Sequence, residues 1–300
     1  MWLVFALLTT LAWGAADLFY KKGAEPNDRY SHLKTAIMVG IVMGIHGIAY
    51  MLINKIQFDP MNLILYFPVS FLYILSMTIG YLGLRYIELS ISSPIQNSSG
   101  AVTAILIFIF FQTRLSGLEI TSIVIITVGI LALAILEKRL ADQELTLTSG
   151  ERKKYVTGFI AIIFPILYCI IDGLGTFADA IYLDEMALIS EDQALLAYEF
   201  TFAIAALVCY IFLRAKKEPF NPFSEKDKAA AAVFETAGQF FYVFAMADNA
   251  IITAPVVASY SMVSVLLSRI FLKEKLQKKQ YIAVATVLVG ILLLAISESQ

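Results

Sequence analysis

The sequence predicts an all-α integral membrane protein with ten transmembrane helices arranged as two inverted five-helix repeats. Three observations predict this fold class. The 300-residue chain is strongly apolar, its apolar runs have the length of membrane-spanning helices, and its second half repeats the pattern of its first.

The composition excludes a soluble globular protein. Hydrophobic residues make up 59% of the chain and charged residues 15%, against averages of about half and about a quarter in soluble domains. A soluble domain of this length has too small a core to bury so many apolar side chains. The net charge of −2 provides no basic field that would attract nucleic acid. Cys169 and Cys209 both lie in apolar runs, which is not the pattern of a disulfide or metal framework.

Ten apolar runs suit a membrane crossing. The hydrocarbon core of a bilayer needs about 20 apolar residues per helix, and charged or turn-rich segments separate the runs. The shortest of these breaks is Ala247-Asp248-Asn249, which is nearly too short to reverse the chain. The predicted spans are 2–20, 33–54, 62–87, 91–112, 118–136, 154–177, 192–214, 229–247, 250–271 and 279–297.

The first run is predicted to be a retained span. A signal peptide carries positive charge before its apolar stretch. Here Lys21 and Lys22 follow the run, and no basic residue precedes it.

The basic residues predict the orientation of the chain. Of the 22 Lys and Arg residues, 20 lie in or beside the odd-numbered connections, and only Lys55 and Arg114 lie in the even-numbered ones. The positive-inside rule then places the odd-numbered connections in the cytoplasm and both termini outside.

An internal repeat relates the two halves. Residues 81–135 align without a gap with residues 242–296, at an offset of 161, and 16 of the 55 pairs are identical. The alternative is chance similarity between two segments of biased apolar composition. Pairs that argue against chance include Pro94 with Pro255 and Gly129 with Gly290.

The repeat predicts the relative direction of the halves. Because five helices are an odd number, the second copy must insert upside down relative to the first. Inverted repeats are a recurring plan of secondary transporters, whose binding site lies near the bilayer midplane between the halves. We expect a first repeat at 1–140, a linker at 141–153 and a second repeat at 154–300.

Short motifs in a fixed order carry a resemblance to a known family. They are Trp13-Gly14 in the first helix, the proline-containing helix starts at Pro94 and Pro255, and Glu274-Lys275-Leu276 before a final helix with Val289-Gly290-Ile291-Leu292. With its ten predicted helices, the chain resembles the drug/metabolite transporter superfamily, and within it the EamA-type members. The resemblance implies a transporter of a small organic metabolite. The chain departs from the family at Thr113, where the first repeat lacks an acidic residue, and in its predicted termini, which the family usually keeps in the cytoplasm.

Acidic side chains inside the predicted spans are the first candidates for function. A charge at the bilayer centre costs at least ~2.5–3.5 kcal/mol, so its presence needs a reason. Asp17 and Asp172 hold corresponding places in the two halves, where they could flank a central cavity. Glu199 and Glu235 are further candidates, and His46 is the one histidine well inside a predicted span. The alternative for each acid is a packing role beside a hydroxyl group or a lysine such as Lys21.

Aromatic side chains accompany the two aspartates. Trp13 lies one turn before Asp17 and Tyr168 one turn before Asp172, so each pair shares a helix face. Aromatic rings attract cations, including quaternary ammonium groups. Tyr81 and Tyr242, which correspond at the 161-residue offset, are added to the candidates, although plain packing is the alternative for any aromatic residue.

Polar and small residues complete the candidate site. The segment around Gln96 and Asn97 is too polar to face lipid, and we expect it to line the cavity. Pro94 and Pro255 are expected in the first turn of their helices, where proline is well tolerated. Gly129 and Gly290 are expected to permit close helix packing.

These residues predict a secondary active transporter of a small organic metabolite of the amino acid, amine or quaternary ammonium type. The acidic side chains inside the predicted spans have no basic side chain at a similar depth, so each could bind either a proton or a cationic group of the substrate. Competition between the two at one acid is the simplest basis for proton-coupled export by alternating access. The alternatives are a membrane enzyme or lipid-handling protein that uses the same acids, and a non-transporting scaffold.

The sequence contains no Walker-type phosphate loop, HExxH or Gly-x-Ser-x-Gly motif. We therefore predict no enzymatic activity, metal or cofactor. The expected partners are a small-molecule substrate, the lipid bilayer and protons, and not nucleic acid. We expect a multi-pass protein of the bacterial cytoplasmic membrane, as a monomer or homodimer.

Overall fold

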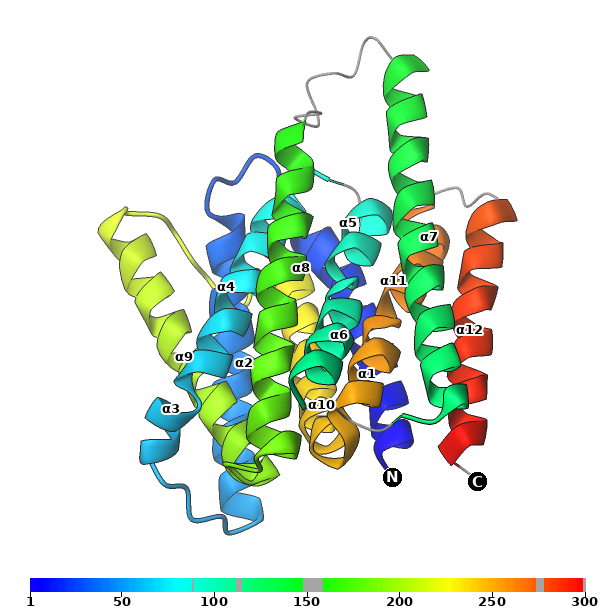
Figure 1. The fold of residues 1–300 in the computed structure, drawn as a ribbon. Helices are drawn as coiled ribbons and strands as arrows, with labels where there is room; N and C mark the ends of the chain where they lie inside the picture. The colour runs from blue at the N-terminus through cyan, green and yellow to red at the C-terminus, as the bar shows by residue number, and fades with distance from the viewer. Residues whose placement is uncertain (88, 112–114, 148–158, 274–277, 299–300) are drawn as a thin grey trace.

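All secondary structure among the described residues of the computed structural model is helical (Figure 1). The structure describes residues 1–300 except 88, 112–114, 148–158, 274–277 and 299–300. Thr113 and Glu274-Lys275-Leu276 therefore lie outside the described residues. In chain order the elements are α1 (Trp2–Gly23), α2 (Ser31–Ile53), α3 (Met61–Leu65), α4 (Phe67–Gly83), α5 (Leu89–Gln96), α6 (Ser99–Phe111), α7 (Gly117–Leu147), α8 (Phe159–Ala180), the π-helical turn η1 (Ile181–Glu185), α9 (Glu191–Ala215), α10 (Lys226–Ala258), α11 (Tyr260–Leu267), the π-helical turn η2 (Ser268–Leu272) and α12 (Lys278–Glu298).

Seven helices among the described residues are long and apolar enough to cross a membrane, and Phe67–Gly83 and Tyr281–Leu293 are shorter apolar helices. The longest of the seven, Lys226–Leu272, contains 47 residues, about twice what one crossing needs. Large apolar side chains are exposed along α2, α6, α7 and α9, as expected for helices that face lipid. The count of ten spans stays a prediction.

The 47-residue segment reverses direction at Asn249, whose backbone is extended and not helical (φ −166°, ψ 88°). Before this residue, α10 runs antiparallel to α1, and after it the chain runs parallel to α1. The contacts that show this are Gly23–Lys228 and Thr9–Gly238 before the bend, and Thr10–Val256 and Asp17–Ser264 after it. The short break predicted at 247–249 is thus a true reversal of the chain.

The bundle has two chemically different ends. Figure 1 shows the α1–α2 and α9–α10 connections at one end, and the start of α1 and the end of α12 at the other. We call the first the basic end: there Lys228, which is 1% exposed, pairs with Glu25 at 2.8 Å and with Glu225. At the other, which we call the terminal end, the Met1 amino group lies 3.6 Å from Asp248. Which end faces the cytoplasm stays a prediction.

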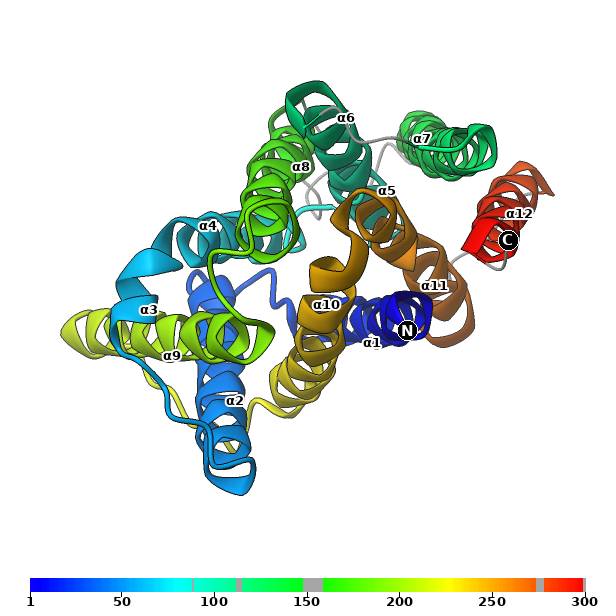
Figure 2. The same cartoon turned by 60° about the horizontal axis from the view of Figure 1, so that its bottom comes forward.

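The contact between α7 and α12, which lie side by side in both Figure 1 and Figure 2, shows how the two halves are related. A Cβ atom at Gly129 would lie 2.6 Å from Val287, and one at Gly290 would lie 2.7 Å from Ile126. Ile126 and Val287 are themselves 161 residues apart, so the two contacts are copies of each other. Because the helices run antiparallel here, the axis that exchanges them is perpendicular to both. This is the geometry expected of an inverted repeat.

The first helices of the halves match at a different register from the one expected. Gly14 packs against Tyr260 and Val263. Gly173 packs in the same way against Ser99 and Val102, which lie 161 residues earlier.

The structural offset between α1 and α8 is therefore 159. The expected pairing of Trp13 with Tyr168 and of Asp17 with Asp172 was one helical turn out of register. In the structure Trp13 corresponds to Asp172, and Asp17 corresponds to Thr176.

Both halves break a helix at corresponding positions. α5 ends at Gln96 and α6 begins at Ser99, while α10 ends at Ala258 and α11 begins at Tyr260. The expectation that Pro94 lies in a first helical turn was wrong, because α5 already begins at Leu89 and Pro94 lies inside it. Pro255 also lies beyond a first turn, because it is the sixth residue of the helical segment that follows the reversal at Asn249.

Two spans run further than expected. α7 continues to Leu147, and α8 continues through η1 to Glu185. The extension of α8 brings Asp179, which lay beyond the predicted span, into the interior of the bundle, where it is fully buried.

Candidate functional site

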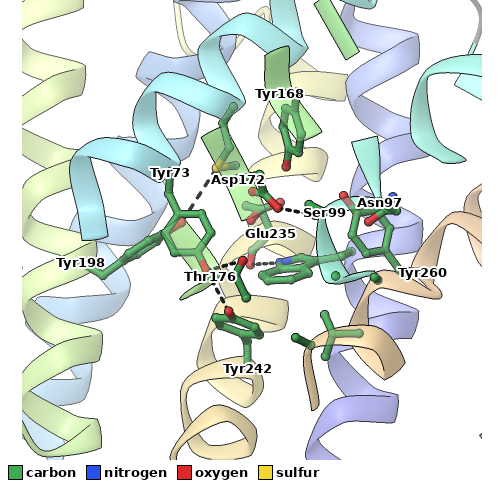
Figure 3. Close-up of a pocket in the computed structure, with 16 residues that line it drawn as sticks. Tyr73, Asn97, Ser99, Tyr168, Asp172, Thr176, Tyr198, Glu235, Tyr242 and Tyr260 are labelled. Atoms are coloured by element: carbon green, nitrogen blue, oxygen red, sulfur yellow. Dashed lines mark hydrogen bonds between the residues drawn. The ribbon is translucent and has the colours of Figure 1, made fainter. Parts of the chain in front are cut away.

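A small cavity lies where α1, α4, α8 and α10 meet the broken helices (Figure 3). Its volume is about 50 Å³, enough for a few water molecules. Six of the predicted candidates and ten further residues line it. The lining residues are Trp13, Tyr73, Met77, Asn97, Ser99, Gly100, Tyr168, Asp172, Thr176, Tyr198, Glu235, Tyr242, Ala254, Val257, Ala258 and Tyr260.

Two carboxyl groups, Asp172 and Glu235, line the cavity. Ser99 donates a hydrogen bond of 2.8 Å to Asp172 Oδ2, and Ser76 donates a long one of 3.5 Å to Oδ1. Tyr20 donates to Glu235 Oε2 at 3.2 Å. None of the lining residues is a Lys, Arg or His, and no basic side chain of the described residues pairs with either acid. The cavity is therefore acidic.

Aromatic rings form much of the remaining wall. The Trp13 ring lies 5.0 Å from the Tyr242 ring and 5.8 Å from the Tyr260 ring. Trp13 Nε1 donates to the Glu235 carbonyl at 3.3 Å, which fixes its indole beside the acid. Figure 3 shows Tyr168 near Asp172 and Tyr242 on the opposite side of the cavity.

A cluster of hydroxyl groups closes the cavity toward the terminal end. The Tyr73 and Tyr242 hydroxyls lie 2.7 Å apart, and either can be the donor. Tyr73 also donates to Thr176 Oγ1 at 3.0 Å. These three side chains were not predicted from the sequence as a group.

Asp17 does not line the cavity, contrary to the expectation that both aspartates face it. Ser93 and Ser264 donate to the same oxygen of Asp17, at 2.6 and 2.7 Å. The Lys21 ammonium donates to the carbonyls of Leu84 and Ile87. The packing alternative, a carboxyl group beside neighbouring hydroxyls, therefore describes the geometry of Asp17.

Three other candidates lie away from the cavity. Glu199, on α9, is fully buried and meets His46 Nδ1 of α2 at 2.7 Å. Tyr81 donates to Tyr20 at 3.0 Å, and Tyr20 in turn donates to Glu235, so Tyr20 lies between Tyr81 and that acid. Gln96 is buried, and its Nε2 atom has no hydrogen-bond partner among the described residues.

Several residues that line the cavity are not distinguished by the sequence. Tyr73, Ser99, Thr176, Tyr198 and Tyr260 line the cavity but belong to residue types that occur throughout the spans. The available signal was the repeat itself, because Ser99 and Tyr260 are 161 residues apart and follow the two helix breaks. Among the described residues, no group of three or more His, Cys, Asp or Glu side chains lies close enough to hold a metal ion.

Comparison with known proteins identifies the family. Residues 1–135 and 159–296 match the EamA-like transporter family. The chain belongs to this family. A search of curated proteins finds no match. A solved structure described as "Crystal structure of protein" has the same fold, with a TM-score of 0.67 and 14% identity over 98% of this chain and 96% of that one.

The family match confirms the resemblance to EamA-type members of the drug/metabolite transporter superfamily. It also supports the two-repeat architecture, since the matched segments lie in the two halves of the chain. The chain is thus an integral, multi-pass membrane protein of a transporter family.

Proposed function

We propose that this EamA-like transporter exports a small organic solute with a cationic group, in exchange for protons, across a bacterial cytoplasmic membrane. The solute would be an amine, an amino acid or a quaternary ammonium compound. The halves would rock about the cavity so that it opens to each side in turn.

The composition of the cavity wall carries this proposal. Asp172 and Glu235 supply negative charge, and the lining contains no basic residue to neutralise them. Trp13 and Tyr260 add π faces at 5.8 Å from each other, and such faces attract organic cations. Carboxyl groups beside aromatic rings suit a cation that carries apolar substituents.

The same acids support proton coupling. A carboxyl group shielded from water can hold a proton in place of a cation. Because one carboxyl group does not hold both, arrival of a proton at Asp172 or Glu235 would release a bound cation. This competition gives exchange without any further coupling device.

The size of the cavity fits a closed stage of such a cycle. Sites for organic ligands usually measure about 300–1,000 Å³, whereas this cavity measures about 50 Å³. A solute would therefore enter only after the helices that line the cavity separate.

The test is flux into proteoliposomes with and without an imposed proton gradient. The probes are radiolabelled tetramethylammonium, methylamine and lysine, with mannitol as an uncharged control. We expect gradient-driven flux of at least one cation, and its loss in both Asp172→Asn and Glu235→Gln. The matched control is Asp227→Asn, an exposed acid on the same helix as Glu235. Gradient-driven flux of mannitol alone, or unchanged cation flux in both cavity variants, would overturn the proposal.

A further inference from the structure

A third buried carboxyl group lies just outside the cavity, toward the terminal end. Asp179 follows Asp172 by two turns of α8 and is fully buried. Tyr66, which joins α3 to α4 and is also fully buried, donates a hydrogen bond to Asp179 Oδ1. The other oxygen, Oδ2, is buried without a hydrogen-bond partner, and no basic side chain among the described residues lies within salt-bridge distance.

Tyrosine hydroxyls connect this acid to the cavity. The titratable groups that face Asp179 are Tyr66, Tyr73 on α4, Tyr198 on α9 and Tyr242 on α10. Tyr73 and Tyr242 both line the cavity and share a hydrogen bond of 2.7 Å. Because either hydroxyl can be its donor, the pair can relay a proton from the cavity once one of the two hydroxyls turns away from its present partner and toward the unpartnered Asp179 Oδ2.

The repeat places a similar cluster on the other side of the cavity. Tyr242 corresponds to Tyr81 at the 161-residue offset, and Asp179 corresponds to Tyr20 at the 159-residue offset of α1 and α8. Tyr81 donates to Tyr20, and Tyr20 donates to Glu235. Each side of the cavity therefore has a carboxyl group that accepts a hydrogen bond from a tyrosine.

The two clusters lie toward opposite ends of the bundle. Tyr20 precedes Lys21 at the basic end. Asp179 lies near η1, whose Asp184 accepts a hydrogen bond from the Ala250 N–H at the chain reversal of the terminal end.

We propose that Asp179 is a second proton-binding residue, which takes up a proton on Oδ2 through the Tyr73–Tyr242 pair. Oδ1 then acts as the carbonyl oxygen that accepts from Tyr66, so the protonated acid keeps its existing hydrogen bond. The proton arrives from water in the cavity as the hydroxyl chain is reprotonated behind it, and it leaves by the same route. The part that this proton plays in transport rests on the function proposed above. In that function Asp179 would exchange protons toward the terminal end and Glu235 toward the basic end.

The test is infrared difference spectroscopy on the full chain in liposomes, between about pH 8 and about pH 5.5, a range in which exposed carboxyl groups stay ionised. The signal is the carbonyl stretch of buried carboxyl groups that gain a proton. We expect Asp179→Asn to lose one component of this band. We expect Tyr66→Phe to keep that component and shift it to higher frequency, because its carbonyl loses a hydrogen bond. Asp227→Asn, at an exposed position, should leave the band unchanged.

Two results would overturn the proposal: a band in Asp179→Asn identical to that of the unaltered protein, or an unshifted band in Tyr66→Phe. If Asp179→Asn does not fold, the Tyr66→Phe spectrum still decides, since a purely structural Asp179 has no titrating component to shift. The measurement uses no transported solute. Absence of coupled flux would therefore overturn the proposed function without contradicting proton binding at Asp179. Conversely, an unchanged infrared band in Asp179→Asn would overturn proton binding at Asp179 without contradicting the proposed function.

Discussion

Alanine at Gly129 or Gly290 is expected to destabilise the protein equally, because the two glycines occupy copies of one contact. A Cβ atom at Gly129 would lie 2.6 Å from Val287 Cγ2 and 3.2 Å from the Val287 backbone nitrogen. At Gly290 it would lie 2.7 Å from Ile126 Cγ1 and 3.1 Å from the Ile126 nitrogen. Since the partners include backbone, a rotamer change does not relieve the overlap, and α7 and α12 must move apart.

The magnitude follows from two opposing effects. Forcing an extra methyl group into a packed contact costs about 1–3 kcal/mol. Replacing glycine by alanine inside a helix returns up to about 1 kcal/mol. With the full return, each single variant loses about 0–2 kcal/mol of stability, and the two losses should be equal. The double variant should lose less than the sum, because the first substitution already separates the helices for the second.

Thermal unfolding in detergent measures these losses for the two single variants and the double variant. Gly117→Ala is the matched control, because it lies on the same helix α7 and its Cβ atom would meet nothing within 4 Å. The reasoning is refuted if the two single variants differ clearly from each other, or if their effects add fully. Either outcome would mean that the α7–α12 contact is not the symmetric contact described above.

Three other predictions follow from the structure. Glu199→Gln should keep cation flux but lower stability by about 1–3 kcal/mol by weakening the 2.7 Å contact with His46, as flux and thermal unfolding would show. Loss of coupling would instead return Glu199 to the candidate site. Burial acts to raise the pKa of Asp28, but the Lys34 ammonium, 2.7 Å away, and the Tyr30 N–H outweigh it and hold the pKa below its usual 3.8. Because the folded value is the lower one, this stabilisation is present above about pH 4 and is lost as the pH falls through the folded pKa, so the unfolding temperature of Asp28→Asn should depend less on pH in that acidic range. In a background without Cys169 and Cys209, an impermeant thiol reagent should label Gln57→Cys in intact cells and spare Phe223→Cys, and the opposite pattern would reverse the orientation.

Much of the fold could be predicted because membrane helices leave a strong mark on a sequence. Apolar runs follow from the thickness of the hydrocarbon core, and the break at Asp248 interrupts one of them. The 161-residue offset is visible because the two copies of the repeat keep identical residues at corresponding positions. Helix ends were predicted less well, since helices can extend beyond the hydrocarbon core into polar sequence. This is why α7 runs on to Leu147 and why Asp179 lies beyond the predicted span 154–177.

The site could be predicted only in part. Whether a buried acid packs against hydroxyl groups or lines a cavity depends on which distant side chains lie beside it in the fold, and the sequence does not show these neighbours. Asp17 and Asp172 looked alike, each one turn after an aromatic residue. In the structure Asp17 accepts hydrogen bonds from Ser93 of α5 and Ser264 of α11 and lies outside the cavity. Asp172 lines the cavity. Those serines are distant in the chain and carry no signal of their own.

The one-turn correction in register changes what the pseudo-symmetry says about the cavity. At matched positions the two halves present different chemistry: one copy gives an acid or a small polar group, and the other gives an aromatic or apolar one. An approximately symmetric scaffold thus builds an asymmetric wall, which would orient a solute that has a charged end and an apolar end. Such orientation is useful to a transporter with inverted repeats, because the scaffold can open to both sides while the solute keeps one set of contacts. The matched positions that line the cavity are Asp172 with Trp13, Ser99 with Tyr260, and Asn97 with Ala258.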